Sequence, residues 1–320
     1  MKFEPAKLSR VIEQNYSHLM PDFFKMQTEY LASLNIIYKD LDAALVAMVL
    51  TSGLYKNNRD QNSGKNKYSL SNFYQKETYQ LPISSFKIKE ISIILNLPRE
   101  TVRRKREKLI KDKLIILDKK KKLYTLNSDL VQRYIIDVQI DNLSRFLSKF
   151  SIFFSRNKFF VKEVTSQQIK NDVEEKFLLY LTNFLDFQIS YFSKMKTLLD
   201  IESIFIVLLC ALNTTSQLKN ATSPMSYQDI FANIHILNRT LGLNATSIAE
   251  ITKVPRTTVL RKIAYLEQTG ILKKDQYKRY TINDISSMNG SKNILSIMNH
   301  NLKILGVFFS QCFETYSTKS

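Results

Sequence analysis

Apolar and polar positions follow the same order twice along the chain. Each time, apolar residues recur at three- and four-residue spacing over a long segment, which predicts an amphipathic α-helix. A shorter apolar helix follows, and then a polar stretch rich in Asn, Ser and Lys that predicts a loop. The helices are expected over residues 21–37, 41–55, 178–199 and 200–213, and the loops over residues 57–67 and 214–223.

After the second loop, the pattern changes to two short helices separated by a turn. Asn244 can cap a helix over residues 245–252, with Ile248 and Ile251 facing the core. Pro255 suits the first turn of the next helix, because its missing N–H costs no hydrogen bond there. Three apolar residues then form one stripe at spacing i, i+4 and i+7, namely Val259, Ile263 and Leu266.

Two short strands are expected after this second helix. Gly270 can adopt the left-handed conformation that ends a helix. The strands span residues 271–273 and 279–283 and flank a charged tip at residues 274–278. A helix, a turn, a helix and a two-stranded hairpin together predict a winged helix-turn-helix.

An earlier part of the chain contains the same motif. Residues 91–113 match residues 248–270 at a constant offset of 157, and nine of the 23 positions are identical. Strands are expected after it, over residues 114–117 and 123–127. Weaker matches flank the motif in the same order, so we predict a duplication. The predicted domains are residues 1–158, with a winged-helix core at 84–127, and residues 159–320, with a core at 241–283.

The first copy departs from the second at two positions. Arg106 stands where the apolar stripe has Ile263, and we expect its stem to lie along the edge of the core. Lys113 replaces Gly270, so we expect a different turn. Both changes predict a less well packed first core.

A long helix is expected after each hairpin, over residues 128–155 and 291–314. Phe146, Phe150 and Phe154 lie along one side of the first of these helices. An aromatic stripe at helical spacing is more typical of a core between helices than of a ligand cleft. The predicted fold class is therefore mainly α, with two tandem winged helix-turn-helix units, flanking long helices and a pseudo-two-fold arrangement.

The charge of the chain favours a polyanionic partner, with nucleic acid ahead of an acidic membrane surface. Lys and Arg number 47 against 29 Asp and Glu, which gives a net charge of +18. The two predicted cores carry +14 of this charge. Six of the 13 arginines lie in the second helices of the two motifs: Arg99, Arg103, Arg104, Arg106, Arg256 and Arg261. This concentration favours DNA contact over an ordinary solvated surface.

Several enzyme classes lack support in the sequence. The six glycines do not form a phosphate-binding loop, and the three histidines and two cysteines lack the spacing of metal ligands. We expect no cofactor, no metal and no catalysis. Cys210 and Cys312 are expected as buried free thiols, which suits a reducing cytoplasm. The longest apolar run is about half of what a bilayer requires, and the first residues lack a signal core. A soluble, nucleoid-associated cytoplasmic protein without a membrane partner is expected.

The motif resembles a known group of proteins. Residues 248–274, IAEITKVPRTTVLRKIAYLEQTGILKK, resemble the helix-turn-helix of IclR-type regulators, and the layout of the surrounding helices resembles the MarR family of bacterial winged-helix regulators. This resemblance covers about 90 residues and implies a DNA-binding regulator of transcription. Such regulators generally act as two-fold dimers. One chain holds both copies here, so we expect a monomer that works as a pseudo-dimer, with further self-association left open.

The winged-helix geometry assigns roles to the residues of the two second helices. The N-terminal turns of a recognition helix face base edges in the major groove, and the hairpin contacts the backbone or the minor groove. Base contacts are expected from Arg99, Glu100, Arg103, Arg256, Thr257 and Leu260. Phosphate or mixed contacts are expected from Thr101, Arg104, Lys105, Thr258, Arg261 and Lys262, with capping as an alternative for the two threonines. Hairpin contacts are expected from Lys119, Lys120, Lys121, Lys122, Lys274, Lys278 and Arg279, with a solvated turn as an alternative for the four consecutive lysines.

The expected function is therefore sequence-specific binding of double-stranded DNA by a transcriptional regulator. The two copies differ at Glu100 and Thr257 and at Arg103 and Leu260, which predicts an asymmetric binding site. A plasmid-type replication initiator is an alternative, because these are also basic proteins with tandem winged helices. A module used only for protein contacts, and a small-molecule effector bound between the long helices and the core, also stay open.

Overall fold

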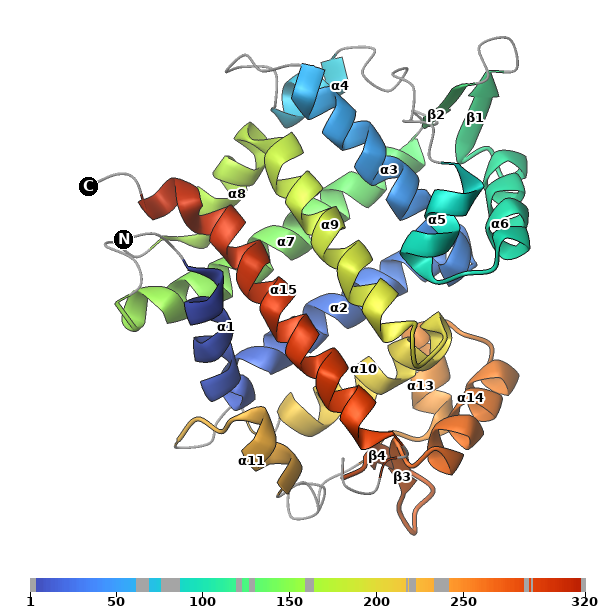
Figure 1. Cartoon of the computed structure of the whole chain (residues 1–320), viewed down its shortest axis with the longest axis vertical. Helices are drawn as coiled ribbons and strands as arrows, with labels where there is room; N and C mark the ends of the chain where they lie inside the picture. The colour runs from blue at the N-terminus through green and yellow to red at the C-terminus, as the bar shows by residue number, and fades with distance from the viewer. Residues whose placement is uncertain are drawn as a thin grey trace. The chain divides into compact units, whose positions relative to one another are not determined.

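The structure, a computed structural model, describes residues 4–61, 69–75, 87–118, 123–126, 130–158, 164–216, 218, 223–232, 242–284, 288 and 290–317. Within these ranges the protein has fourteen helices and two antiparallel hairpins of two strands each (Figure 1). The predicted mainly α fold class is confirmed.

The chain divides into two compact units that do not coincide with the two sequence repeats. Unit 1 combines residues 1–36 with residues 194–314, and unit 2 consists mainly of residues 37–193. Unit 1 thus joins the N-terminal helices to the second copy of the motif, while unit 2 joins the first copy to a long helix that precedes the second. The repeat boundary at residue 158 falls within unit 2. The duplication itself, with its boundary at residue 158, stays a prediction.

Unit 1 packs its C-terminal helix against its N-terminal helix. Gly306 permits this approach, because a Cβ there would lie 2.4 Å from the Pro5 carbonyl oxygen. Cys210 and Cys312 are buried free thiols, as predicted, and burial raises the pKa of Cys210 to about 12. The elements of unit 1 are α1 (Pro5–Gln14), most of α2 (Tyr16–Tyr38), α10 (Ile201–Ser216), α11 (Tyr227–Ala232), α13 (Ala245–Thr252), α14 (Arg256–Gln268), β3 (Leu272–Lys274), β4 (Tyr280–Ile282) and α15 (Ser291–Ser317).

Unit 2 contains the aromatic stripe that the sequence predicts as a core. Phe146, Phe150 and Phe154 are buried on the long helix α7 (Leu130–Arg156), and successive rings of this stripe contact one another. The elements of unit 2 are α3 (Leu41–Gln61), α4 (Leu70–Gln75), α5 (Ile88–Leu95), α6 (Arg99–Lys111), β1 (Ile115–Asp118), β2 (Leu123–Leu126), α7 (Leu130–Arg156), α8 (Ser166–Glu175) and most of α9 (Phe177–Met195).

Each unit contains one copy of the motif, which we call the first module (α5, α6, β1 and β2) and the second module (α13, α14, β3 and β4). In both modules a left-handed residue ends the first helix: Asn96 at φ 50° and Lys253 at φ 57°. The second helix begins immediately after Pro98 or Pro255. Asn244 caps α13 as predicted, because its side chain accepts a hydrogen bond from the Ser247 N–H at 2.8 Å.

The end of the second helix corrects one expectation. Lys113 takes the left-handed conformation at φ 57°, as Gly270 does at φ 75°. The Leu114 N–H donates to the Leu109 carbonyl at 2.9 Å, and the Ile271 N–H donates to Leu266 at the same distance. The two turns are therefore the same, because these hydrogen bonds hold the lysine in a backbone conformation that favours glycine.

Most of the predicted core positions of the second module are buried, with one exception. Ile248, Val259, Ile263 and Leu266 are almost inaccessible, whereas 45% of Ile251 is exposed. The prediction that Ile251 faces inward is therefore wrong. Thr252, four residues after Ile248, takes the inward position and donates its hydroxyl to the Ile248 carbonyl at 2.7 Å.

The hairpins agree with the predicted strands to within one residue at each end. In the first module Ile115 pairs with Leu126, and in the second Leu272 pairs with Ile282. Leu243, just before α13, adds an isolated bridge to Tyr280 on β4. The hairpin of the second module is thus tied to the segment that enters its first helix.

Candidate nucleic-acid interface

The outward face of α6 carries an ion-paired ladder. Arg99, Glu100, Arg103 and Arg104 are exposed. Arg103 makes two hydrogen bonds to Glu100, at 2.7 and 2.9 Å, and one to Glu107 at 2.7 Å. The hydrogen bond from Arg103 is the main cause that lowers the pKa of Glu100, and it raises the pKa of Arg103 itself. Glu100 and Arg103 therefore present one combined array of donors and acceptors, and Arg99 and Arg104 flank it.

The outward face of α14 has different chemistry at the same positions. Arg256, Thr257, Leu260 and Arg261 are exposed, and 38% of the Leu260 side chain is accessible. Ala264 occupies the position of Glu107 and is also exposed. This face therefore combines two arginines with a stripe of methyl groups and has no carboxylate among these five positions.

Lys105 and Lys262 are held by ion pairs inside their own units. The Nζ atom of Lys105 lies 2.7 Å from Asp40, and both side chains are about one-fifth exposed, at 20% and 19%. Lys262 lies 2.7 Å from Asp200 and 3.9 Å from Glu202. This burial and pairing favour a positioning role over the phosphate contact that the sequence suggests.

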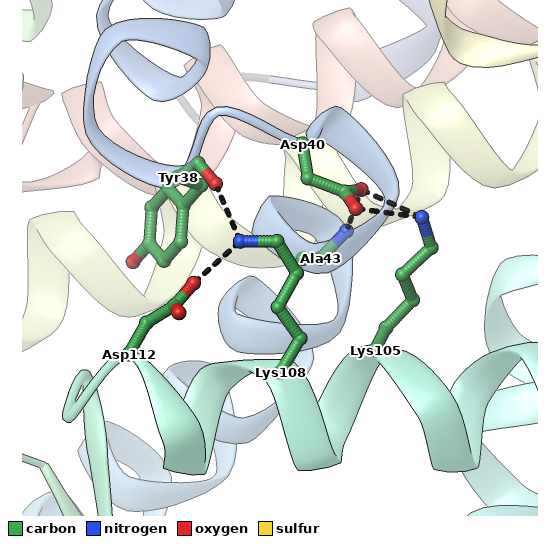
Figure 2. Close-up of polar contacts among 6 residues, drawn as sticks. All are labelled: Tyr38, Asp40, Ala43, Lys105, Lys108 and Asp112. Atoms are coloured by element: carbon green, nitrogen blue, oxygen red, sulfur yellow. Dashed lines mark hydrogen bonds and ion pairs between the residues drawn. The ribbon is translucent and has the colours of Figure 1, made fainter.

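The same two aspartates also cap the N-termini of α3 and α10. Asp40 accepts a hydrogen bond from the Ala43 N–H at the start of α3 (Figure 2), and Asp200 accepts one from the Ser203 N–H at the start of α10, each at 3.0 Å. Each aspartate therefore ties the second helix of a module to the N-terminus of a neighbouring helix. We call these paired contacts, Asp40–Lys105 and Asp200–Lys262, the clasps.

Lys108 adds a further anchor in the first module. Its Nζ atom donates to the Tyr38 carbonyl at 3.4 Å and also contacts Asp112 (Figure 2). The residue at this position in the second module is Tyr265, which is exposed. The first module is therefore fixed to the segment before α3 by two lysines, and the second module has one lysine at these positions.

A side chain from a long helix also holds the first helix of each module. Within unit 1, the Asn35 amide of α2 donates to the Thr252 carbonyl at 3.0 Å. Within unit 2, the Ser193 hydroxyl of α9 donates to the Ile94 carbonyl. Each module is therefore positioned by a helix that belongs to the other sequence repeat.

The two threonines of the motif lie within the first turn of their helices. Thr101 and Thr258 are half-buried, and Pro98 and Pro255 occupy the capping positions. Neither threonine therefore caps the start of its helix.

The hairpin tip of the second module is closed by its own side chains. Asp275 accepts from Arg279 Nε at 2.7 Å, and the Arg279 guanidinium lies 4.8 Å from the centre of the Tyr277 ring. Lys274 and Lys278 are exposed, whereas Arg279 is half-buried. Arg279 thus supports the tip rather than extending from it. Lys119, Lys120, Lys121 and Lys122 lie outside the described residues.

Tyr277 is a surface residue that the sequence reasoning did not select. Two-thirds of it is exposed, at 66%, beside Lys278 at the tip of the hairpin. An aromatic residue in a turn otherwise made of charged and polar residues is the signal that could have identified it.

Two further features, a metal site and a membrane span, are not found in the part of the chain that the structure describes. Those residues include no group of three or more His, Cys, Asp or Glu placed to hold a metal ion. They also contain no helix with the length and apolar character needed to cross a membrane. No protein-family model, curated protein or solved structure matches the chain.

Proposed function

We propose that the chain is a sequence-specific regulator of transcription that binds double-stranded DNA through two winged helix-turn-helix modules. The observation that carries this proposal is that both second helices expose two arginines. In the first module Arg99 is the first residue of the helix and Arg104 lies on the face opposite the buried stripe, and Arg256 and Arg261 take the same places in the second. An arginine near the N-terminus of a groove-binding helix can contact guanine through two hydrogen bonds.

The clasps support this proposal because they leave the arginine-bearing face open. Lys105 and Lys262 point toward Asp40 and Asp200, so each second helix is fixed by its inner side. A rigid helix with an exposed cationic face is what a protein needs to present side chains to base edges with defined geometry. The two modules of one chain then act as a pseudo-dimer on two unlike half-sites.

Selection of bound sequences from random duplex DNA, using the full chain, tests the proposal. We expect an enriched site with two unlike halves and a binding constant that falls steeply with salt. Arg99→Ala and Arg256→Ala should each relax the preference at a different end of the site and weaken binding by about 1–3 kcal/mol.

Lys303→Ala is the matched control, because it removes one exposed charge on α15, outside both modules. It should leave the selected sequence unchanged. Enrichment of no sequence, or equal effects of all three variants, would contradict the proposal. Enrichment of clustered direct repeats would point instead to a replication initiator.

A further inference from the structure

We propose that the second module recognises thymine through the methyl group on C5, with Leu260 as the contacting residue, while the first module recognises its half-site by hydrogen bonds. This inference rests on the proposed DNA-binding function and adds the base chemistry that each module recognises. It follows from a difference between two faces that are otherwise aligned residue by residue.

Three positions change together between α6 and α14. Glu100, Arg103 and Glu107 form the ion-paired ladder of the first module, and Thr257, Leu260 and Ala264 occupy the same positions in the second. Positions i, i+3 and i+7 lie on one face of a helix. The charged ladder of α6 is therefore replaced on α14 by a continuous stripe of methyl-bearing side chains.

A single exposed leucine on a protein surface needs no functional explanation. Leu260 differs because of its place. It lies one turn from Arg256 and next to Arg261. Leu260 is exposed, whereas the neighbouring apolar residues of the same helix, Val259 and Ile263, are buried. It is also the residue that aligns with Arg103. Under the proposed function, Leu260 thus lies at the centre of the surface of α14 that faces the DNA.

The major groove offers a matching partner for such a stripe. The C5-methyl of thymine is the apolar group that bases display there, and apolar side chains contact it. Arg256 and Arg261 on either side supply attraction to phosphates or guanine. On α6, by contrast, the Glu100 carboxylate and the Arg103 guanidinium supply an acceptor and donors, which suit polar base edges.

Replacement of thymine by deoxyuridine removes only the methyl group and thus provides the test. The full chain is titrated with the duplex obtained by selection, in which each thymine is replaced in turn at fixed salt. We expect the dissociation constant to rise about fourfold at one or two thymines, as the burial of one methyl group implies. These thymines should all lie in the half-site whose preference Arg256→Ala relaxes.

Leu260→Ala connects the effect to one side chain. In this variant the same deoxyuridine replacements should change the dissociation constant by less than about 1.5-fold, because the contact has already been lost. Arg103→Ala is the matched control: it alters the aligned position of α6 and should leave the methyl dependence intact. Because Leu260 is exposed, its truncation leaves the core of the module in place.

The outcomes separate this inference from the function on which it rests. If the selected duplex binds but no thymine shows methyl dependence, the inference is overturned and DNA binding stands. The same holds if the dependence persists in Leu260→Ala or lies in the half-site that Arg99→Ala relaxes. If selection enriches no duplex, both the inference and the proposed function fail.

Discussion

The first module places Arg106 where the second places Ile263, and Lys113 where the second places Gly270, yet the two modules fold alike. Ile263 is buried, whereas Arg106 is half-buried. Lys113 nevertheless takes the conformation of Gly270. The comparison shows that the motif keeps its fold with an arginine at an interior position and a lysine at the left-handed turn, where the same backbone hydrogen bond forms in both modules, while the chemistry of its outer face differs.

The largest expected effect is on the interior position that differs. Ile263→Arg gives the second module the residue of the first, but in a site that is 1% accessible. We expect a loss of about 3–5 kcal/mol in the stability of unit 1, because an uncompensated charge is buried. Hydrogen exchange followed on peptides of both modules measures this locally.

The reciprocal variant Arg106→Ile is the control. Since Arg106 is half-buried, we expect the stability of unit 2 to change by less than about 1 kcal/mol. Equal losses in the two variants would show that the two interiors impose the same requirement.

The next largest effect concerns the turn after the second helix. Lys113→Gly should stabilise unit 2 by about 1 kcal/mol, because glycine adopts a positive φ without the steric cost that a lysine Cβ carries. Gly270→Lys should destabilise unit 1 by about 1–2 kcal/mol. Chemical denaturation combined with local hydrogen exchange measures both, and a loss of stability in Lys113→Gly would contradict the explanation.

The clasps should differ in strength despite their equal 2.7 Å contacts. Asp40→Asn keeps an oxygen to cap α3 but leaves Lys105, of which only 20% is exposed, without its carboxylate partner. We expect a loss of about 1 kcal/mol in unit 2, between the values typical of exposed and of buried pairs. Asp200→Asn should cost less, because Lys262 keeps Glu202 at 3.9 Å and Asp200 is 42% exposed. A larger effect at Asp200 would mean that the second carboxylate contributes nothing.

Local patterns in the sequence were sufficient for the elements and most of the buried stripe. Asn244, Gly270 and the positions of Val259 and Leu266 follow from capping preference, backbone freedom and helical spacing. The prediction for Ile251 was wrong because residues three and four positions after Ile248 can both face inward on a helix, and Thr252 takes that place.

The contacts between distant segments were less accessible to sequence reasoning. Lys105 and Asp40 are 65 residues apart, so periodicity carries no information about their pairing. A signal did exist in the sequence. Both copies have an aspartate just before the shorter apolar helix that precedes the motif, and both have a lysine at the same aligned position of the motif. The Glu100–Arg103–Glu107 ladder was also readable, since its members are three and four residues apart. The division into units that cross the repeats has no local signal.

The smallest expected effect is the pH dependence of the second clasp. Burial raises the pKa of Asp200, but hydrogen bonds from Lys262 and the Ser203 N–H and the charge of Lys262 outweigh it, so the pKa lies below its ordinary value. Folded unit 1 therefore binds fewer protons at this site than the unfolded chain does. The stabilisation is present above the unfolded pKa of about 3.9 and is lost as the pH falls through the lower folded value.

Solvent screening limits this stabilisation by the second clasp to below about 1 kcal/mol. The stability difference between the wild type and Asp200→Asn should accordingly be constant from about pH 7 to pH 5 and shrink below about pH 4. Denaturant titrations of both proteins across this range measure it, and a difference that persists unchanged at the acidic end would show that the carboxylate gains nothing from Lys262.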